Sequence, residues 1–310
     1  MSVAMLMSGF FAGEDYYIER LRSRGVGVAH SLAVLRSRGM RGLRRLHMRS
    51  GLPGYAAWFE DWERTVDGAD TIIVHASDLS VPVAGYIHRR WPRKRLISWY
   101  WNPAGPGSDP GLVPPGTGEV WSFDRGDCRA LGLSLNTTYS FRELGDFRGR
   151  GEVDFLFVGS DKGRAAVLAD LARRLEADGY TYRFCVAGMS RRTRDRYPRL
   201  EPIGPIPYVE ILRMTGTARA VVEIPQAGQR GSSLRPVEAV LMGRSVLSLT
   251  SDIRAERLYD PERVFIVGRD RWDGLEQFVE RASAGPVQDI VDYYDFNYWI
   301  RRFDDGGVPL

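Results

Sequence analysis

The sequence predicts an α/β fold made of two Rossmann-like halves, and three observations support this. Short apolar runs rich in Val, Ile and Phe alternate with segments of helical periodicity, as in parallel strands joined by helices. The chain has 310 residues, roughly twice the usual length of one domain. Its hydrophobic fraction of 44% is sufficient for a sizeable core, which excludes a disordered or collagen-like chain.

The first half is predicted to hold four strands separated by helices. The strands are expected at residues 3–7, 71–74, 95–101 and 120–123, and the helices at 15–24 and from Asp78 or Ser80 onward. Pro and Gly recur throughout residues 102–118, so this segment is expected to be a loop. A long loop directly after a strand is a candidate functional segment.

A linker at 147–151 is expected to precede a second series of the same kind. Its strands are predicted at 153–158, 182–187, 218–224, 245–249 and 263–267, and its helices at 164–178 and 235–242. We therefore expect an N-terminal domain at 1–147, a C-terminal domain at 148–288 and an aromatic tail at 289–310. A helix of this tail would return to pack on the first domain, and an oligomer contact is the alternative.

The distribution of basic residues is more informative than the net charge of +4. Only two of the 43 basic residues are lysines, a bias typical of GC-rich genomes. The segment from Arg20 to Arg49, however, contains nine arginines and no acidic residue. Such a block attracts phosphates or an anionic membrane face, although a solvated helix face is the alternative. Nucleic-acid binding is not expected, because aromatic residues are not interleaved with the arginines.

The sequence shows neither a convincing transmembrane helix nor a signal peptide, so a cytoplasmic protein is expected, with peripheral attachment at the inner face of the membrane through the arginine block. Cys128 and Cys185 lie far apart and have no His or Cys at ligand spacing. We therefore expect reduced structural thiols, no disulfide framework and no metal site.

One candidate binding motif spans residues 157–164. An apolar strand ends in a glycine turn that leads directly into a helix, so free amides and the positive end of the helix dipole favour a phosphate there. The residues expected at this site are Gly159, Ser160, Lys162 and Arg164. The motif matches neither a Walker sequence nor the dinucleotide glycine pattern, and an ordinary α/β turn is the alternative.

A second candidate motif spans residues 223–239. A strand leads into a polar loop, and a helix follows with Ser232 or Ser233 as its N-cap. Glu238 would lie about one turn into this helix, where a carboxylate can accept both hydroxyls of a ribose. The loop and helix residues expected to contact a sugar and its phosphates are Gln226, Gly228, Gln229, Arg230 and Arg235. A capped helix with a salt-bridged Glu is the alternative.

These motifs together resemble the GT-B glycosyltransferases, especially the small bacterial enzymes of capsule, exopolysaccharide and lipopolysaccharide synthesis. The resemblance includes the Glu-Ala-x-x-x-Gly-x-x-Val segment at 238–246 and the aromatic segments at 99–103 and 121–124. It implies two Rossmann-like domains facing a cleft, with a nucleoside-diphosphate sugar in the C-terminal domain and the acceptor in the N-terminal domain. Gly159, Lys162 and Arg164 would then face the donor phosphates, and Glu238 the ribose.

The sequence departs from that family in two places. The first strand is followed by residues 8–13 rather than by a Gly-Gly loop, and Arg230 stands eight residues before Glu238, where many retaining members have a second Glu. The stereochemical outcome therefore stays open. Positive charge from the arginines would stabilise the departing diphosphate, so neither a metal nor a cofactor is expected.

An inverting transferase also needs a base for the acceptor hydroxyl. The candidates in the first domain are His75 and Asp78, which follow a predicted strand, and Glu14, which follows the first. A hydrogen-bonded surface role is the alternative for His75. The cluster at 99–102 is predicted to be a sugar-stacking platform or a part of the core.

We expect a GT-B glycosyltransferase that transfers a sugar from a nucleotide donor to a glycan or lipid-linked acceptor. Two alternatives remain open at this stage: a non-catalytic protein that retains the nucleotide-sugar pocket, and a nucleotide-sugar epimerase of the same fold.

Overall fold

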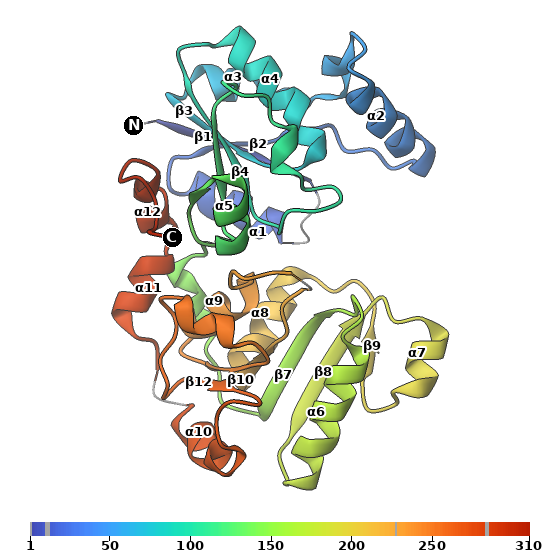
Figure 1. Ribbon diagram of the computed structural model, residues 1–310, viewed down its shortest axis with the longest axis vertical. Coiled ribbons are helices and arrows are strands. Elements are labelled where there is room, and N and C mark those ends of the chain that lie inside the picture. The colour runs from blue at the N-terminus through green and yellow to red at the C-terminus, as the bar shows by residue number, and fades with distance from the viewer. Residues whose placement is uncertain (1, 10–12, 227, 283–284) are drawn as a thin grey trace. The chain divides into compact units, whose positions relative to one another are not determined.

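The structure is a computed structural model that describes residues 2–9, 13–226, 228–282 and 285–310. Contacts divide the chain into two compact units. Unit 1 comprises Met1–Asn136 together with Gly306–Leu310, and unit 2 comprises Thr137–Asp305. Each unit is described separately below (Figure 1).

Unit 1 is built on a six-stranded parallel sheet with the order β2-β1-β3-β4-β5-β6. Helices connect most of the successive parallel strands, and a long loop connects β4 to β5. The strands are β1 (Val3–Met7), β2 (Gly27–His30), β3 (Thr71–His75), β4 (Arg95–Tyr100), β5 (Glu119–Ser122) and β6 (Ser134–Leu135). The α-helices are α1 (Glu14–Arg22), α2 (Arg38–Ser50), α3 (Glu63–Asp67), α4 (Val81–Arg90) and α5 (Arg125–Leu131).

The core of unit 1 forms because its central strands are apolar on both faces. Leu6 of β1 and Ile72 and Val74 of β3 are fully buried. On one face they pack with Val83 and Ile87 of α4, which are spaced four residues apart and so share one side of that helix. Continuous apolar strands of this kind are typical of parallel sheets covered by helices.

Helix α2 is less well covered than the other helices of unit 1. It begins at an N-cap, Ser37, whose side chain accepts a hydrogen bond from the backbone of Met40, and it ends at Gly51 in the left-handed conformation. Only Arg44 and Met48 are buried among its residues. Figure 1 shows this helix projecting to one side of the sheet of unit 1.

Unit 2 contains a second six-stranded parallel sheet, with the order β12-β11-β10-β7-β8-β9. Its strands are β7 (Val153–Ser160), β8 (Tyr182–Ala187), β9 (Glu201–Ile203), β10 (Ala218–Glu223), β11 (Ser245–Ser248) and β12 (Val264–Ile266). Its α-helices are α6 (Ala165–Ala177), α7 (Arg191–Arg196), α8 (Tyr208–Thr217), α9 (Leu234–Leu241), α10 (Leu275–Arg281), α11 (Gln288–Tyr294) and α12 (Phe296–Trp299).

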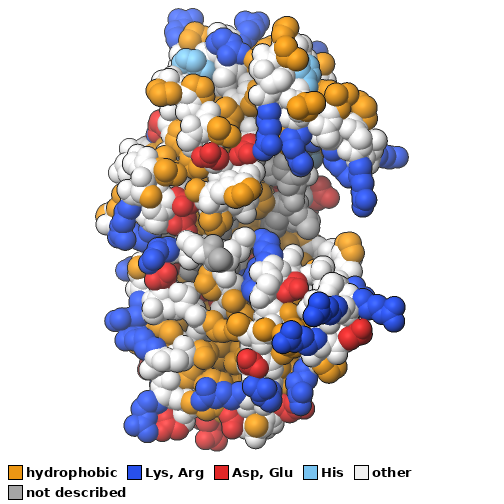
Figure 2. All heavy atoms as spheres, turned by 45° about the vertical axis from the view of Figure 1, so that its right-hand side comes forward, with side chains coloured by type: hydrophobic (Ala, Val, Ile, Leu, Met, Phe, Trp, Pro, Cys, Tyr) orange, Lys and Arg blue, Asp and Glu red, His pale blue; other side chains and the backbone are white. Residues whose placement is uncertain are grey.

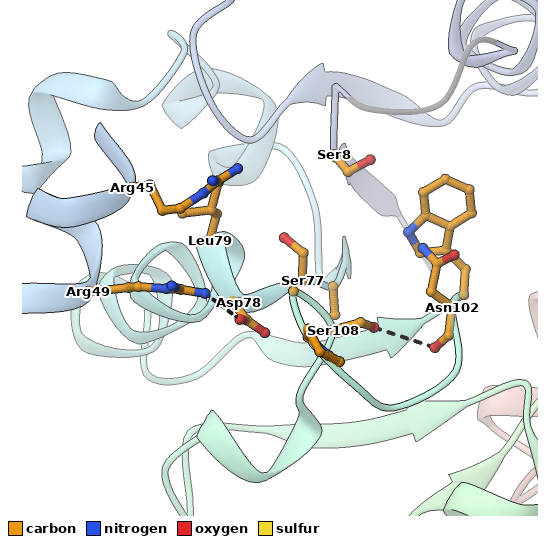
Figure 3. Close-up of a pocket in the computed structure, with 12 residues that line it drawn as sticks. Ser8, Arg45, Arg49, Ser77, Asp78, Leu79, Asn102 and Ser108 are labelled. Atoms are coloured by element: carbon orange, nitrogen blue, oxygen red, sulfur yellow. Dashed lines mark hydrogen bonds and ion pairs between the residues drawn. The ribbon is translucent and has the colours of Figure 1, made fainter. Parts of the chain in front are cut away.

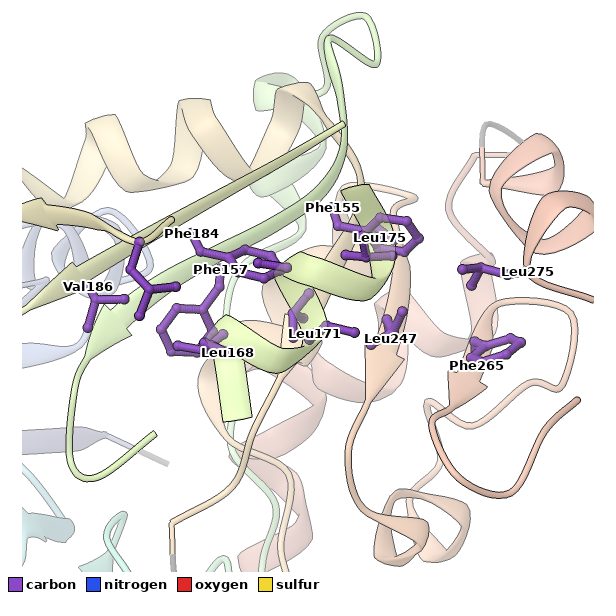
Figure 4. Packing of buried hydrophobic residues seen from close by; sticks show 14 of the residues in the cluster. Phe155, Phe157, Leu168, Leu171, Leu175, Phe184, Val186, Leu247, Phe265 and Leu275 are labelled. Carbon is purple, nitrogen blue, oxygen red and sulfur yellow. The ribbon is translucent and has the colours of Figure 1, made fainter. Parts of the chain in front are cut away.

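A core cluster of unit 2 lies between this sheet and α6 (Figure 4). Phe155 and Phe157 alternate along β7 and therefore point to the same face of the sheet. Leu168, Leu171 and Leu175 follow at intervals of three and four residues on α6 and cover them. Leu-to-Ala changes in such a cluster cost about 2–5 kcal/mol.

The predicted α/β class and the two Rossmann-like halves are confirmed. The predicted strand at 182–187 coincides with β8, and the other predicted strands overlap observed ones. Three short strands were not predicted, namely β2, β6 and β9, because their two to four residues carry little of the apolar signal. Residues 102–118 form a loop with only a short 3-10 turn, as expected.

The division between the units differs from the predicted boundary at 147/148, because it falls between Asn136 and Thr137. The aromatic tail also divides differently from the prediction. Helices α11 and α12 belong to unit 2, and Gly306–Leu310 alone belongs to unit 1.

The contacts of the tail explain this difference. The Trp299 ring lies 4.2 Å from that of Tyr139, centroid to centroid, and its Nε1 donates to the carbonyl of Thr137. In unit 1, the backbone N–H of Val308 donates to the carbonyl of Leu135 at the end of β6. The tail aromatics therefore fasten the first residues of unit 2 rather than covering unit 1.

Within the described residues, no helix is both long and apolar enough to span a bilayer. Cys128 and Cys185 are both buried and unpaired with each other. Burial raises the pKa of the Cys128 thiol to about 11, which favours the protonated thiol expected of a structural cysteine.

Candidate functional site

Each sheet has one position at which the strand order reverses. In unit 1 this position lies between β1 and β3, and in unit 2 between β7 and β10. In open α/β sheets, ligands bind in the crevice beyond the carboxyl ends of the strands at such positions. The predicted base candidates follow β1 and β3, and the predicted binding motifs follow β7 and β10.

A pocket of about 440 Å³ lies at the reversal position of unit 1 (Figure 3). Ser8 lines it from the end of β1, and residues 76–79 line it from the end of β3. Arg45 and Arg49 of α2 form another part of its wall. The loop after β4 completes it with Trp101, Asn102 and residues 106–108.

Asp78 lies in this pocket, but both of its carboxylate oxygens are engaged. Its Oδ2 accepts a hydrogen bond from Arg49 Nη2 at 3.0 Å, and its Oδ1 accepts one from the backbone of Asp109 at 2.9 Å. Asp78 therefore links α2 to the loop after β4.

Glu14 is the first residue of α1 and is almost completely buried, with 4% of its surface exposed. Its Oε1 accepts hydrogen bonds from Ser8 Oγ at 2.8 Å and from the backbone of Gly9 at 3.0 Å. Its Oε2 lies 3.5 Å from His30 Nε2. Burial raises the pKa of Glu14, and these hydrogen bonds and His30 offset only part of that rise.

His30 and Glu60 extend this group beyond the residues identified from the sequence. His30 ends β2, and its Nδ1 lies 3.4 Å from Glu60 Oε2, so a carboxylate lies near each ring nitrogen. The backbone N–H of His30 also donates to Glu60 Oε2 at 2.9 Å. The short strand β2 was not predicted, so the sequence analysis could not show that His30 ends a strand adjacent to β1.

His75 has a different environment from the one predicted for a base. It ends β3 with 4% of its surface exposed, and its ring lies 5.2 Å from that of Trp99 and 5.9 Å from that of Trp101. Burial lowers the pKa of His75 to about 3, so the imidazole is neutral at physiological pH. His75 is therefore a core residue, which differs from both the role of a base and a surface role.

The aromatic cluster after β4 is divided between the core and the pocket. Trp99 and Tyr100 are buried, and the Tyr100 hydroxyl donates to the carbonyl of Asp109 at 3.3 Å. Trp101 is partly exposed and lines the pocket together with Asn102. Within the predicted sugar-stacking segment at 99–102, Trp101 and Asn102 are therefore the residues that can contact a ligand in the pocket.

In unit 2, the turn between β7 and α6 contains the first predicted binding motif. Gly159 and Ser160 end β7, and Lys162 adopts a left-handed conformation with φ of 40°. Asp161 Oδ1 accepts from the backbone N–H of Ala165 at 3.1 Å, so the chain itself provides one anion at the start of α6. The pKa of Lys162 is lowered by burial and by neighbouring Arg164.

Arg164 spans the reversal position of unit 2. Its Nη1 donates to the carbonyl of Ile224, the residue after β10, at 2.9 Å. Its guanidinium lies 5.6 Å from the Phe157 ring centroid, within the range of a cation–π contact. Its burial lowers its pKa. The structure thus brings together the two motifs, which are some 60 residues apart in the sequence.

The loop between β10 and α9 is held mainly by its own side chains. Gln229 is buried, and its Nε2 donates to the carbonyl of Gly231 at 2.7 Å. Its Oε1 accepts from the backbone of Gln226 at 3.3 Å. Gly228 has a φ of 83°, which favours glycine, and Arg230 Nη1 lies 3.8 Å from Asp252 Oδ1 on the exposed side.

Glu238 is completely buried within α9. One oxygen accepts a hydrogen bond from the Tyr208 hydroxyl, and the other is ion-paired with Arg235 one turn earlier. Burial raises the pKa of Glu238, and Arg235 and the Tyr208 hydroxyl lower it in part. The Arg235 side chain keeps 22% of its surface exposed, so it reaches toward solvent while Glu238 does not.

Glu223, which the sequence motifs did not single out as a site residue, ends β10 in a buried position. Its Oε1 accepts from the backbone N–H and the hydroxyl of Ser233, the N-cap residue of α9, at 3.3 and 3.5 Å. Burial raises the pKa of Glu223 to about 8, and nearby Glu256 contributes to the rise. The available sequence signal was an acidic residue that directly follows the apolar run at 220–222.

Comparison with known structures identifies the fold. No protein-family model matches the sequence, and no curated protein is significantly similar to it. AviGT4, a glycosyltransferase involved in avilamycin A biosynthesis, aligns over 98% of this chain and 96% of its own, with a TM-score of 0.59 and 18% identity. The chain has the GT-B fold.

Two other structures with this fold contain nucleotide sugars. HepE of Anabaena, in complex with UDP-glucose, aligns over 98% of this chain and 99% of its own, with a TM-score of 0.60 and 11% identity. The UDP-GlcNAc 2-epimerase of Neisseria meningitidis, bound to UDP-GlcNAc, covers 99% of both chains with a TM-score of 0.51 and 11% identity. This GT-B protein is therefore similar in fold to transferases and to epimerases.

Proposed function

We propose that this GT-B protein is a glycosyltransferase that moves a sugar from a nucleoside-diphosphate sugar to a hydroxyl of a glycan or lipid-linked acceptor, in the synthesis of bacterial surface polysaccharide or another glycoconjugate. The observation that carries the proposal is the pair of cations at the reversal position of unit 2. Lys162 and Arg164 occupy the turn after β7, and Arg164 reaches the end of β10. HepE, which has the same fold, binds UDP-glucose.

On the donor side, the cations would stabilise the diphosphate as it departs from the sugar. Preorganised positive groups are most effective where negative charge develops in the transition state. Lys162, Arg164 and Arg230 would supply this charge, with Gly159 and Gly228 allowing the backbone to approach the phosphates. Because arginines carry this charge, the proposal requires neither a metal nor a cofactor.

For Glu238, the contacts with Tyr208 and Arg235 favour a role that differs from direct contact with ribose. A buried carboxylate that accepts from Tyr208 and pairs with Arg235 fixes the direction of the guanidinium. We therefore propose Arg235 as the group that contacts the donor. Glu238 then acts as the positioning residue for Arg235.

On the acceptor side, Glu14 is the proposed general base. The acceptor oxygen forms a bond to the anomeric carbon, the bond from that carbon to the diphosphate oxygen breaks, and Glu14 takes the hydroxyl proton. Its raised pKa brings the carboxylate closer to the range in which proton transfer is effective. One ring nitrogen of His30 would bind the second oxygen of Glu14, and the other ring nitrogen would bind Glu60.

A binding titration tests the donor site. We expect the melting temperature to rise with one of UDP, GDP or dTDP, since a ligand at about 100 times its Kd adds about 2.7 kcal/mol to the stability of the native state. Lys162→Gln should weaken that binding about tenfold or more, and the Arg192→Gln change in the exposed helix α7 should not. The titrations are run in EDTA, and no response to any of the nucleotides would refute the donor site.

Turnover distinguishes the alternatives that share this fold. Release of an epimerised or free sugar from the nucleotide sugar without an acceptor would favour the epimerase. Binding without turnover across an acceptor panel would favour a non-catalytic protein. A glycosylated acceptor with release of the nucleoside diphosphate is the result expected here.

We also propose that α2 attaches this protein to an anionic membrane surface. Met40, Leu43 and Leu46 expose 42%, 53% and 69% of their surface at intervals of three residues, so they form one apolar stripe. Arginines occupy another side of the same helix. A helix with these two faces lies in the plane of a membrane interface and is attracted to anionic lipids. Figure 2 shows hydrophobic and basic side chains side by side on the surface of the molecule.

A vesicle assay tests this attachment. We expect the double change Leu43→Gln and Leu46→Gln to reduce co-sedimentation with phosphatidylglycerol-containing vesicles at least tenfold, since a fully buried Leu contributes about 1.5–3 kcal/mol. The control is Val167→Gln, which alters an exposed apolar residue of α6 in unit 2. Equal sedimentation of both variants would count against the membrane role of α2.

A further inference from the structure

The pocket of unit 1 carries positive charge that the described residues do not fully neutralise. Arg45 and Arg49 are spaced one turn apart on α2 and both line the pocket. The charge of Arg49 is balanced by Asp78 at 3.0 Å. Within the described part of the chain, Arg45 has no hydrogen-bond or ion-pair partner, so its guanidinium is available to a ligand.

The other lining groups suit a polyhydroxylated molecule. Ser77, Ser108 and Asn102 supply hydroxyl and amide groups, and Trp101 supplies an aromatic surface. The volume of about 440 Å³ falls within the range of about 300–1,000 Å³ that is typical of small-molecule sites. The pocket therefore combines sugar-binding chemistry with one unpaired cation.

The pocket also has a direction. Figure 3 shows Arg45 and Arg49 on one side and Ser8 and Asn102 on the other. The Ser8 hydroxyl donates a hydrogen bond to Glu14 Oε1 at 2.8 Å. The side of the pocket opposite the arginines is therefore the side nearest the proposed base. A ligand held at Arg45 by an anionic group would point its remaining hydroxyls toward Ser8 and Glu14.

We propose that the acceptor of this protein is a sugar phosphate, whose phosphate is bound by Arg45 while a hydroxyl is presented to Glu14. This inference rests on the proposed transferase function and specifies its acceptor class. A guanidinium binds phosphate through paired, charge-assisted hydrogen bonds. Arg49, held by Asp78, lies beside the phosphate and adds to the local positive potential. The phosphate can belong to a soluble sugar phosphate or to a polyprenyl-linked sugar.

The test is a calorimetric titration of the full chain with a soluble probe and a lipid probe, in the presence of saturating donor nucleotide. The soluble probe is glucose 1-phosphate, with methyl glucoside as its uncharged counterpart. The lipid probe is farnesyl diphosphate in phosphatidylcholine vesicles. We expect binding of at least one phosphate probe, no comparable binding of methyl glucoside, and a loss of about tenfold in Arg45→Gln.

The matched control is Arg38→Gln, which makes the same change on the exposed start of α2, outside the residues that line the pocket. Binding of glucose 1-phosphate supports a soluble acceptor, and binding of the lipid probe alone supports a lipid-linked one. Equal losses in both variants, or no phosphate binding in the unmodified chain, would overturn the proposal. Competition between the nucleotide and the phosphate probes would assign the pocket to the donor and overturn it too.

The donor titration separates this inference from the proposed function. Arg45→Gln should bind the nucleotide with an unchanged Kd, because Arg45 belongs to unit 1 and the proposed donor residues belong to unit 2. A chain that binds nucleotide but no phosphate probe retains the proposed function and loses this inference. A chain that binds no nucleotide loses the proposed function itself.

Discussion

Replacement of Glu14 by Gln is expected to lower kcat by about 100-fold or more, since general base catalysis contributes roughly 10²–10⁴-fold. Gln retains an oxygen that can accept from Ser8 and Gly9, so the fold and the donor Kd should be preserved. The measurement is initial-rate kinetics with the acceptor that the turnover assay across the acceptor panel identifies. The melting temperature and the donor Kd are determined in parallel.

The pH dependence of the rate distinguishes a general base from a structural carboxyl. A base is active when deprotonated, so the rate of the unmodified protein should rise with pH through the raised pKa of Glu14. The residual rate of Glu14→Gln should lack this rise. Glu60→Gln is the matched control, because Glu60 contacts His30 rather than the proposed reaction centre, and its effect should be smaller. A Glu14→Gln variant with unaltered kcat and pH profile would show that this carboxyl is purely structural.

The second large effect concerns Glu223 and the stability of unit 2. Burial raises the pKa of this carboxyl to about 8 in the folded state, above the ordinary value of 4.5. Between roughly pH 5 and pH 8 the native state therefore keeps a proton that the unfolded state has lost. The free energy of unfolding should fall as pH rises through this window, by up to about 1.4 kcal/mol per pH unit.

Glu223→Gln should remove this contribution, because an amide keeps the shape of the neutral carboxyl and does not ionise. Urea unfolding of both proteins at pH 5, 6, 7 and 8 measures the effect, and the variant should gain stability relative to the parent as the pH rises. The control is Glu262→Gln, whose carboxylate is 71% exposed in the same unit. Parallel pH dependences of the parent and Glu223→Gln would mean that Glu223 is already ionised in the native state.

The same residue makes a contact that the sequence motifs did not reveal. The sequence motifs indicated a helix start near Ser233, and the structure confirms that α9 begins there. They did not reveal that Glu223 Oε1 accepts from Ser233 at this helix start. A strand-end carboxyl meets a helix ten residues later only when the intervening loop folds back, and that loop is held by the internal hydrogen bonds of Gln229.

The sequence by itself determined the α/β class, the positions of most strands and the location of the candidate sites after β1, β3, β7 and β10. It could do so because strands buried on both faces require continuous apolar runs, and ligand sites in such folds follow the ends of strands. The hydrogen bond from Arg164 to the carbonyl of Ile224 joins the two motifs of unit 2, as expected for segments that follow neighbouring strands.

The tertiary structure alone decided which of the candidate side chains are accessible and with which groups they pair. The sequence suggested His75 as a base and Glu238 as a ribose contact, but His75 is buried beside two Trp rings and Glu238 between Tyr208 and Arg235. Arg45 belongs to the arginine block seen in the sequence, but only the structure shows that it lines the pocket and has no partner among the described residues. Accessibility and charge pairing depend on contacts between segments far apart in the chain, and local residue patterns carry no record of those contacts.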